Sequence, residues 1–118
     1  MTKENGFIGV DLDCTLAHYT QFKGPEDIGD PIEPMVDRVK GWVKEGKDVR
    51  IFSARGKESY PAMRRWMAKH LGVILPITNV KEQNMYAFYD DRAIGMEPNT
   101  GEPYSQENED EALNRDHK

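Results

Sequence analysis

The fold of this chain is decided by residues 7–16, FIGVDLDCTL. Phe7–Val10 is a short apolar run of strand-forming residues, in which Gly9 allows close packing of the backbone. The run ends in two aspartates at alternate positions, and side chains at i and i+2 of an extended segment point the same way. We therefore expect the carboxylates of Asp11 and Asp13 to face one spot.

Two such carboxylates need a positive partner. At a separation of about 4 Å they repel by about 4 kcal/mol when the effective dielectric constant is near 20. A hard divalent cation is the usual partner, and Mg²⁺ suits oxygen ligands while keeping water molecules that a phosphate can displace. An isolated Asp-x-Asp is also typical of a strand end with two solvated acids, so this motif alone does not decide between the two interpretations.

Length and composition limit the classes of protein. The 118 residues are enough for one domain with a single core. A net charge of −5 and a pI near 5.2 argue against a large non-specific nucleic-acid surface, although a local basic patch stays open. There is no apolar run long enough for a membrane span and no signal-peptide pattern. The single cysteine, Cys14, fits a reducing compartment, so we expect a soluble, cytoplasmic protein without membrane association.

Strands and helices alternate in the rest of the sequence. Apolar residues at helical spacing predict helices over residues 34–45 and from the capping residue Ser59 to Leu71, with Gly46 and Gly72 ending them. Strands are predicted within 7–10, 48–52, 73–78 and 85–89, the third as an edge strand and the fourth as a buried one.

This alternation indicates βαβ units. The prediction is an α/β fold with a Rossmann-like parallel sheet in three layers, with helices on both faces. Ligands bind outside the carboxyl ends of the strands in such sheets. The predicted strands are followed at that edge by Asp11, Asp13, Ser53, Arg55, Lys81, Asp90 and Asp91.

Two segments lie outside the alternation. Residues 17–33 contain Gly24-Pro25 and Asp30-Pro31, which predicts a loop whose residues 17–30 form a flap beside the site. Residues 105–118 are almost wholly charged or amide, which predicts a polar, disordered tail. The domain is therefore assigned to residues 1–104.

Taken together, these residues resemble the haloacid dehalogenase (HAD) superfamily of phosphohydrolases. The four motifs occur in order as Asp11-Leu12-Asp13-Cys14-Thr15, Ser53, Lys81 and Asp90-Asp91. The resemblance implies a HAD-like fold and a Mg²⁺-dependent phosphatase that hydrolyses phosphomonoesters through an aspartyl-phosphate.

The resemblance also implies a role for each motif residue. Asp11 would attack phosphorus as the nucleophile, and Asp13 would act as general acid and then as general base. Lys81 would neutralise charge on the nucleophile and the phosphoryl group. The phosphate-binding residues would be Thr15, Ser53 and Arg55, and the metal-binding residues Asp11, Asp13 through its backbone carbonyl, Asp90 and Asp91.

Arg55 has two interpretations. Ser53-Ala54-Arg55 is similar to a sequence in the phosphatase domain of bacteriophage polynucleotide kinase, as is Asp90-Asp91-Arg92. Arg55 is expected either to hold a substrate phosphate through its forked donors or to form a salt bridge with a nearby acid. Arg92 is expected to be structural.

Cys14 departs from the family pattern. Many members have glycine between the aspartate and the threonine, which leaves the local backbone conformation open. We expect Cys14 to be a small packed residue and not a nucleophile.

The spacing of the motifs bears on the substrate. The intervals from Thr15 to Ser53 and from Ser53 to Lys81 are too short for a cap domain, so an open site is predicted. Candidate substrates are a nucleotide, a terminal phosphate of nucleic acid, a sugar phosphate and a phosphoprotein. From another class, the alternatives are a receiver-like phospho-signalling domain, whose motif order differs, and a non-catalytic scaffold. Nothing in the sequence predicts the oligomeric state.

Overall fold

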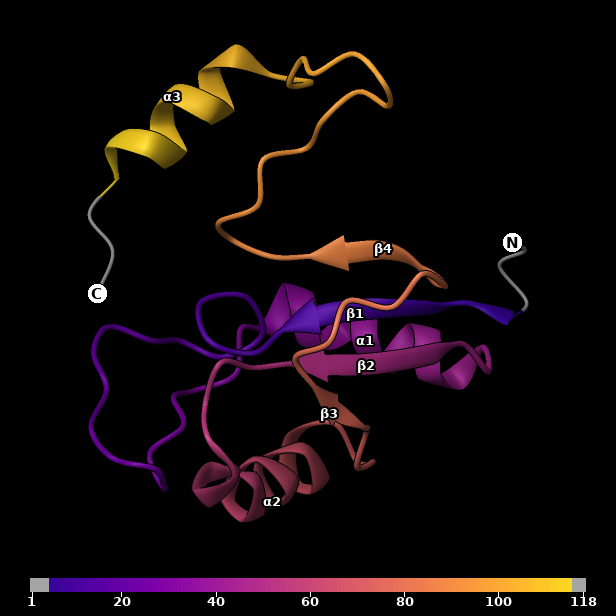
Figure 1. Ribbon diagram of the computed structural model, residues 1–118. Helices are drawn as coiled ribbons and strands as arrows, with labels where there is room; N and C mark the ends of the chain where they lie inside the picture. Colours follow the sequence, from indigo (N-terminus) through magenta and orange to yellow (C-terminus); the bar gives the residue numbers. More distant parts are fainter. Residues whose placement is uncertain (1–4, 116–118) are drawn as a thin grey trace.

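A computed structural model describes residues 5–115 of the chain (Figure 1). It is an α/β structure with a four-stranded, all-parallel sheet and three α-helices, which confirms the predicted class and strand direction. The elements are β1 (Phe7–Asp11), α1 (Glu33–Lys44), β2 (Asp48–Phe52), η2 (Lys57–Ser59), α2 (Tyr60–His70), β3 (Ile77–Thr78), β4 (Met85–Tyr89) and α3 (Gln106–Asn114). Within residues 5–115, no helix is long and apolar enough to cross a lipid bilayer.

Strand β1 lies inside the sheet, whose order is β3-β2-β1-β4. It pairs with β2 from Phe7↔Asp48 to Asp11↔Phe52, and with β4 on its other side. Because every pairing is parallel, the carboxyl ends of β1, β2 and β4 reach the same edge of the sheet, at the left in Figure 1. The residues that follow these strands are thereby brought together.

Helices α1 and α2 pack into one hydrophobic core with the sheet. Helix α1 has Pro34 in its first turn, as predicted, and Gly46, with φ of 81°, follows its last turn. Ile8 and Val10 of β1 point into this core because alternate residues of a strand share a face. The helices and the other strands contribute Met35, Val36, Val39, Val49, Ile51, Met63, Trp66, Met67 and Leu71.

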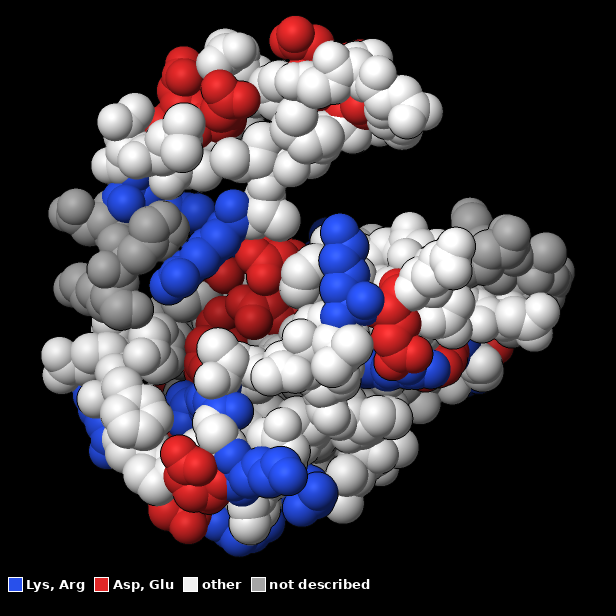
Figure 2. Space-filling view, viewed as in Figure 1, with Lys and Arg blue, Asp and Glu red and all other residues white. Residues whose placement is uncertain are grey.

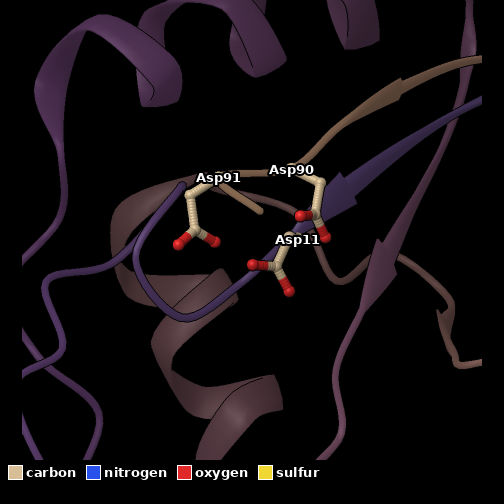
Figure 3. Close-up of side chains that lie close together, drawn as sticks. All are labelled: Asp11, Asp90 and Asp91. Carbon is tan, nitrogen blue, oxygen red and sulfur yellow. The ribbon is translucent and has the colours of Figure 1, made fainter. Parts of the chain in front are cut away.

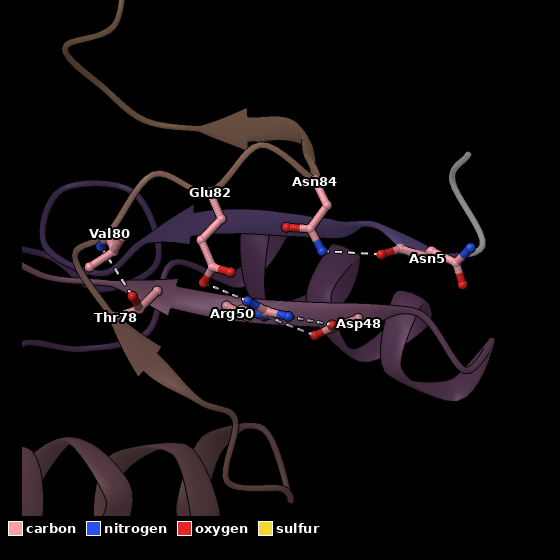
Figure 4. A network of polar contacts seen from close by, with 7 residues as sticks. All are labelled: Asn5, Asp48, Arg50, Thr78, Val80, Glu82 and Asn84. Carbon is pink, nitrogen blue, oxygen red and sulfur yellow. Dashed lines mark hydrogen bonds and ion pairs between the residues drawn. The ribbon is translucent and has the colours of Figure 1, made fainter. Parts of the chain in front are cut away.

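The opposite face of the sheet carries aromatic side chains and one arginine. The rings of Phe7 and Phe52 stack with centroids 6.4 Å apart, and the Arg50 guanidinium lies 3.9 Å from the centroid of Phe7. Arg50 also donates hydrogen bonds to Asp48 and, at 2.9 Å, to Glu82 (Figure 4). The segment before β4 is thereby tied to the middle of the sheet.

Two local predictions differ from the structure. Strand β4 was predicted to be buried, but it is the outer strand of the sheet and exposes 39% of Phe88 and 38% of Tyr89. Ser59 precedes α2 as predicted, yet its side chain makes no capping hydrogen bond, and its buried hydroxyl has no partner. A sheet position depends on which strands pair, and a hydroxyl's direction depends on its rotamer, so local sequence specifies neither.

The C-terminal segment contains a helix where a disordered tail was predicted. Helix α3 begins after Ser105, whose hydroxyl accepts a hydrogen bond from the Asn108 amide at 3.1 Å. Acidic Glu107 and Glu109 in its first turn are favourable near the positive end of the helix dipole. None of its residues is buried, so capping and helix propensity form it without the core.

The close packing at Gly9 predicts the outcome of a substitution. A Cβ at this position would lie 2.6 Å from the Met85 sulfur and 2.9 Å from the Phe52 ring, so Gly9→Ala should destabilise the fold by about 1–3 kcal/mol. Gly41→Ala is the control, because nothing lies within 4 Å of its added Cβ and alanine favours helix α1 by about 0.5–1 kcal/mol. Thermal unfolding of both variants tests this, and a shift of the same sign in both would contradict it.

Candidate metal and phosphate site

Three carboxylates converge at the carboxyl edge of the sheet. Asp11 ends β1, and Asp90 and Asp91 follow β4 directly. Each offers one oxygen, and these three oxygens all lie within 4.8 Å of one another (Figure 3). The parallel pairing of β1 with β4 therefore makes one cluster from residues that lie almost 80 positions apart in sequence.

The backbone after β4 holds one of these carboxylates in place. Asp90 Oδ1 accepts hydrogen bonds from the amides of Arg92 at 2.7 Å and Ala93 at 3.1 Å. This is the local turn that aspartate commonly makes with the amides of the second and third residues after it. One oxygen of Asp90 is thus fixed by the turn, and the carboxylate faces Asp11 (Figure 3).

The cluster changes the titration of Asp11. Burial raises the pKa of Asp11 to about 8, with further contributions from the charge of Asp90, a hydrogen bond shared with Asp91 and the charges of Asp91 and Asp13. Without a cation, Asp11 therefore holds a proton at neutral pH. A cation bound among these oxygens would favour the ionised form, and an all-carboxylate donor set fits a hard divalent ion such as Mg²⁺.

Asp13 does not join the three carboxylates. Its side chain accepts two hydrogen bonds from Arg55, from Nε at 2.9 Å and from Nη2 at 3.0 Å, in the bidentate geometry typical of arginine with a carboxylate. The sequence prediction placed Asp13 in the metal set through its backbone carbonyl, together with Asp11, Asp90 and Asp91. The salt bridge of its carboxylate does not affect that carbonyl, so this role stays a prediction.

Arg55 is almost enclosed by protein. Its side chain exposes 6% of its surface, and its hydrogen bonds to Asp13 raise its pKa above the usual value. The backbone amide of Arg55 donates to the hydroxyl of Ser53 at 3.0 Å, so the turn after β2 fixes its course. Nη1 is buried and has no partner, which is costly for a charged donor and leaves one arm of the fork for another group. The salt-bridge interpretation is therefore confirmed, with a donor to spare.

The other predicted phosphate-binding residues lie in different surroundings. Thr15 Oγ1 is buried and unpartnered, two residues beyond Asp13, although Thr15 is not among the residues that line the cavity described below. The hydroxyl of Ser53, which is 4% exposed, accepts the hydrogen bond from the Arg55 amide. Lys81 is exposed and does not line that cavity either. The phosphate-binding role of Thr15 and the catalytic role of Lys81 therefore stay predictions.

A cavity of about 570 Å³ opens beside the cluster. Figure 2 shows acidic side chains at the bottom of a hollow with basic side chains around it. The cavity is lined by Asp11, Asp13, Cys14, Tyr19, Phe22, Ala54, Arg55, Gly56, Asp90, Asp91 and Arg92. Sequence reasoning missed Tyr19 and Phe22 and took Arg92 as structural. Two aromatic residues in an otherwise polar flap were the signal for the first pair, and the position of Arg92 directly after the acidic pair was the signal for the last.

Cys14 has the backbone conformation that explains the glycine of the family pattern. Its φ is 74°, in the left-handed region that side chains with a Cβ rarely adopt. Cys14 is exposed, so the expectation of a packed, buried residue was wrong. The pKa of its thiol is raised, first by partial desolvation and then by the charges of Asp91, Asp11 and Asp13. A raised pKa disfavours the thiolate, so Cys14 is unsuited to be a nucleophile.

No protein-family model matches this chain, and no curated protein or solved structure shows significant similarity to it. The likeness to HAD phosphohydrolases therefore stays a prediction from the motifs.

The pKa of Asp11 predicts how stability depends on pH. Between 3.8, the ordinary value, and about 8, the folded protein binds a proton that the unfolded chain releases, so stability should fall as pH rises through this window. Asp11→Asn removes this dependence, and at pH 8 it should raise the melting temperature without metal by roughly 4 °C, the effect of about 1 kcal/mol. Thermal melts from pH 4 to pH 9 in chelator measure both, and equal slopes for the two proteins would contradict the assignment.

The Asp13–Arg55 pair predicts a coupling free energy. In a double-mutant cycle with Asp13→Ala and Arg55→Met, we expect a coupling of at least about 1 kcal/mol, because the pair is bidentate and largely buried. The control cycle uses Glu26 and Arg65, a pair with side chains 71% and 65% exposed, and should give less than about 0.5 kcal/mol. Denaturant unfolding measures both, and similar couplings would show that burial of the first pair adds nothing.

Proposed function

We propose that this chain is a Mg²⁺-dependent phosphatase that hydrolyses phosphomonoesters through an aspartyl-phosphate on Asp11. The observation that supports this most is the joint presence of three convergent carboxylates and two buried donors without partners, Thr15 Oγ1 and Arg55 Nη1. Carboxylates suit a cation and orphan donors suit an anion. A phosphate monoester with Mg²⁺ supplies both.

A bound cation would stabilise negative charge at this site. Bound by Asp11, Asp90 and Asp91, Mg²⁺ would keep these carboxylates ionised and offset negative charge on the phosphoryl oxygens. We propose the backbone carbonyl of Asp13 as a further ligand of the cation.

The chain's own residues would carry the bond changes. An Asp11 oxygen forms a bond to phosphorus while the bond from phosphorus to the alcohol oxygen breaks, and Asp13 gives that oxygen its proton. Water then attacks phosphorus, its proton passes to Asp13, and the bond to Asp11 breaks to release orthophosphate. Because Arg55 donates two hydrogen bonds to Asp13, the pair must open before Asp13 can hold this proton.

Binding of the phosphoryl group would use the unpartnered donors. Thr15 Oγ1 and Arg55 Nη1 are proposed to donate to phosphoryl oxygens, with Ser53 holding the backbone that carries Arg55. Arg92 lines the cavity and supplies a second positive charge there. Lys81, which is exposed between β3 and β4, is proposed as the catalytic cation.

We also propose a three-layer, Rossmann-like arrangement without a cap. The segment between β1 and α1 is too short for a cap domain, and the partly exposed Phe88 marks the face of the sheet on which a third layer would lie. An open cavity agrees with substrates ranging from a nucleotide or a nucleic-acid end to a sugar phosphate or phosphoprotein. Against a non-catalytic scaffold or a receiver-like domain, the proposal relies on the buried donors beside the carboxylates.

Metal dependence and two substitutions test this function. Hydrolysis of an aryl phosphate should stop in chelator and return with Mg²⁺. Asp11→Asn should reduce turnover to background, and Asp13→Asn should lower kcat by roughly 10²–10⁴-fold, the usual contribution of positioned acid–base catalysis. Asp37→Asn, which makes the same charge change on the exposed side of α1, should leave turnover unaltered.

Trapping the phosphoenzyme identifies the nucleophile. Beryllium fluoride, which mimics a phosphoryl group on aspartate, should bind the intact chain and not Asp11→Asn. Full turnover in chelator, or trapping on another residue, would refute the proposed mechanism.

A further inference from the structure

The flap of residues 17–30 is fixed at its base. The His18 amide donates to the carbonyl of Asp30 at 2.8 Å, and the indole of Trp66 donates to the carbonyl of Gly29 at 2.8 Å. A Cβ on Gly29 would lie 2.0 Å from the His18 carbonyl oxygen, so the two sides of the base are in close contact. The two ends of the flap are therefore joined to each other, and the flap is attached to α2 through Trp66.

The first part of the flap presents two aromatic residues to the cavity. Tyr19 and Phe22 both line it, and 59% of the Phe22 surface is exposed. The Arg55 guanidinium lies 5.8 Å from the centroid of the Phe22 ring, so the ring lies near the guanidinium that carries the unpartnered Nη1. An exposed phenylalanine usually has no functional meaning, but here it forms a wall of the same cavity as the carboxylates.

The size of the cavity requires more than a phosphoryl group to fill it. Its volume of about 570 Å³ lies within the range of about 300–1,000 Å³ that is typical for whole small-molecule ligands. The carboxylates and Arg55 line part of the cavity, and Tyr19 and Phe22 of the flap line another part. That space would receive the leaving group of the substrate.

We propose that Tyr19 and Phe22 stack on a planar aromatic ring of the leaving group, so that the substrate is a nucleoside phosphate. This rests on the proposed phosphatase function and names its substrate class. Aromatic side chains bind bases of any sequence through their faces, and a guanidinium beside the stack adds a cation–π contribution. A sugar phosphate offers no such ring, so Phe22 would contribute little to its binding.

Binding can be measured without turnover. Calorimetric titration of the intact chain with Mg²⁺ compares the non-hydrolysable phosphonate analogues of adenosine 5′-monophosphate and ribose 5-phosphate, of which only the first carries a base. We expect the nucleotide to bind roughly tenfold more tightly, and Phe22→Ala to remove that advantage, since base stacking is worth about one order of magnitude in affinity or more.

Three comparisons isolate the stacking role. Phe22→Trp should preserve the preference for the nucleotide because it keeps an aromatic face. Tyr104→Ala, which removes an aromatic side chain that is 68% exposed and outside the cavity, should leave it unchanged. In the chain with Asp11 intact, Phe22→Ala should lower kcat/KM for the nucleotide through KM, with little change for ribose 5-phosphate.

The outcomes separate this inference from the proposed function. Three results would overturn the stacking role even where hydrolysis occurs: equal affinity for the two compounds when Phe22 is intact, binding of neither compound, or an equal loss of affinity for both in Phe22→Ala. A nucleotide preference that depends on Phe22 without hydrolysis would support the stacking role and refute the phosphatase. An oligonucleotide with a terminal phosphate serves as a further ligand, and tighter binding than the mononucleotide would assign the site to nucleic-acid ends.

Discussion

Parallel pairing of β1 with a strand on each side is the constraint on which the rest of this structure depends. It sends the carboxyl ends of β1, β2 and β4 to one edge, where the chain leaves the sheet at Asp11, Phe52 and Tyr89. The residues that follow these three strands therefore lie beside one another. The carboxylate cluster, the Asp13–Arg55 pair and the cavity follow from this edge, and α1 and α2 stabilise it by burying the apolar face of the same strands.

The same arrangement lowers the stability of the protein in the absence of a ligand. Burial and the neighbouring carboxylates raise the pKa of Asp11, so the protein without metal becomes less stable as pH rises towards neutrality. A group that costs stability in the absence of its ligand is typical of binding sites, since the ligand then supplies the missing free energy. Buried Arg55 Nη1 and Thr15 Oγ1 carry a similar cost, and both can donate hydrogen bonds to an anion.

Sequence reasoning recovered the features that depend on local periodicity. The strands at Phe7–Asp11 and Asp48–Phe52 and helix α1 were predicted to within about one residue, because apolar spacing, Pro34 and Gly46 mark them directly. The convergence of Asp11, Asp90 and Asp91 was also predicted, since it needs only strand direction and the rule that ligands lie at the carboxyl edge.

The remaining features depend on side-chain geometry or on position in the sheet. The direction of the Asp13 side chain is set by a partner 42 residues away, the exposure of β4 by the strand order, and the absence of Lys81 from the cavity by the path of the segment before β4. Helix α3 was missed for a different reason. Its capping by Ser105 was visible in the sequence, but a composition without core residues suggested disorder, although an exposed helix needs none.

Charge balance connects the two halves of the site. The charged side chains that line the cavity are Asp11, Asp13, Asp90, Asp91, Arg55 and Arg92. With every carboxylate ionised, four negative charges face two positive ones, and the excess equals the charge of one divalent cation. Protonation of Asp11, whose pKa is raised first by burial and then by these charges, relieves only half of the excess. A bound cation would cancel the excess and return Asp11 to the ionised form. The guanidinium groups, with Arg55 Nη1 unpartnered, would then be the remaining attraction for an anion, so cation binding and phosphate binding at this edge are expected to support each other.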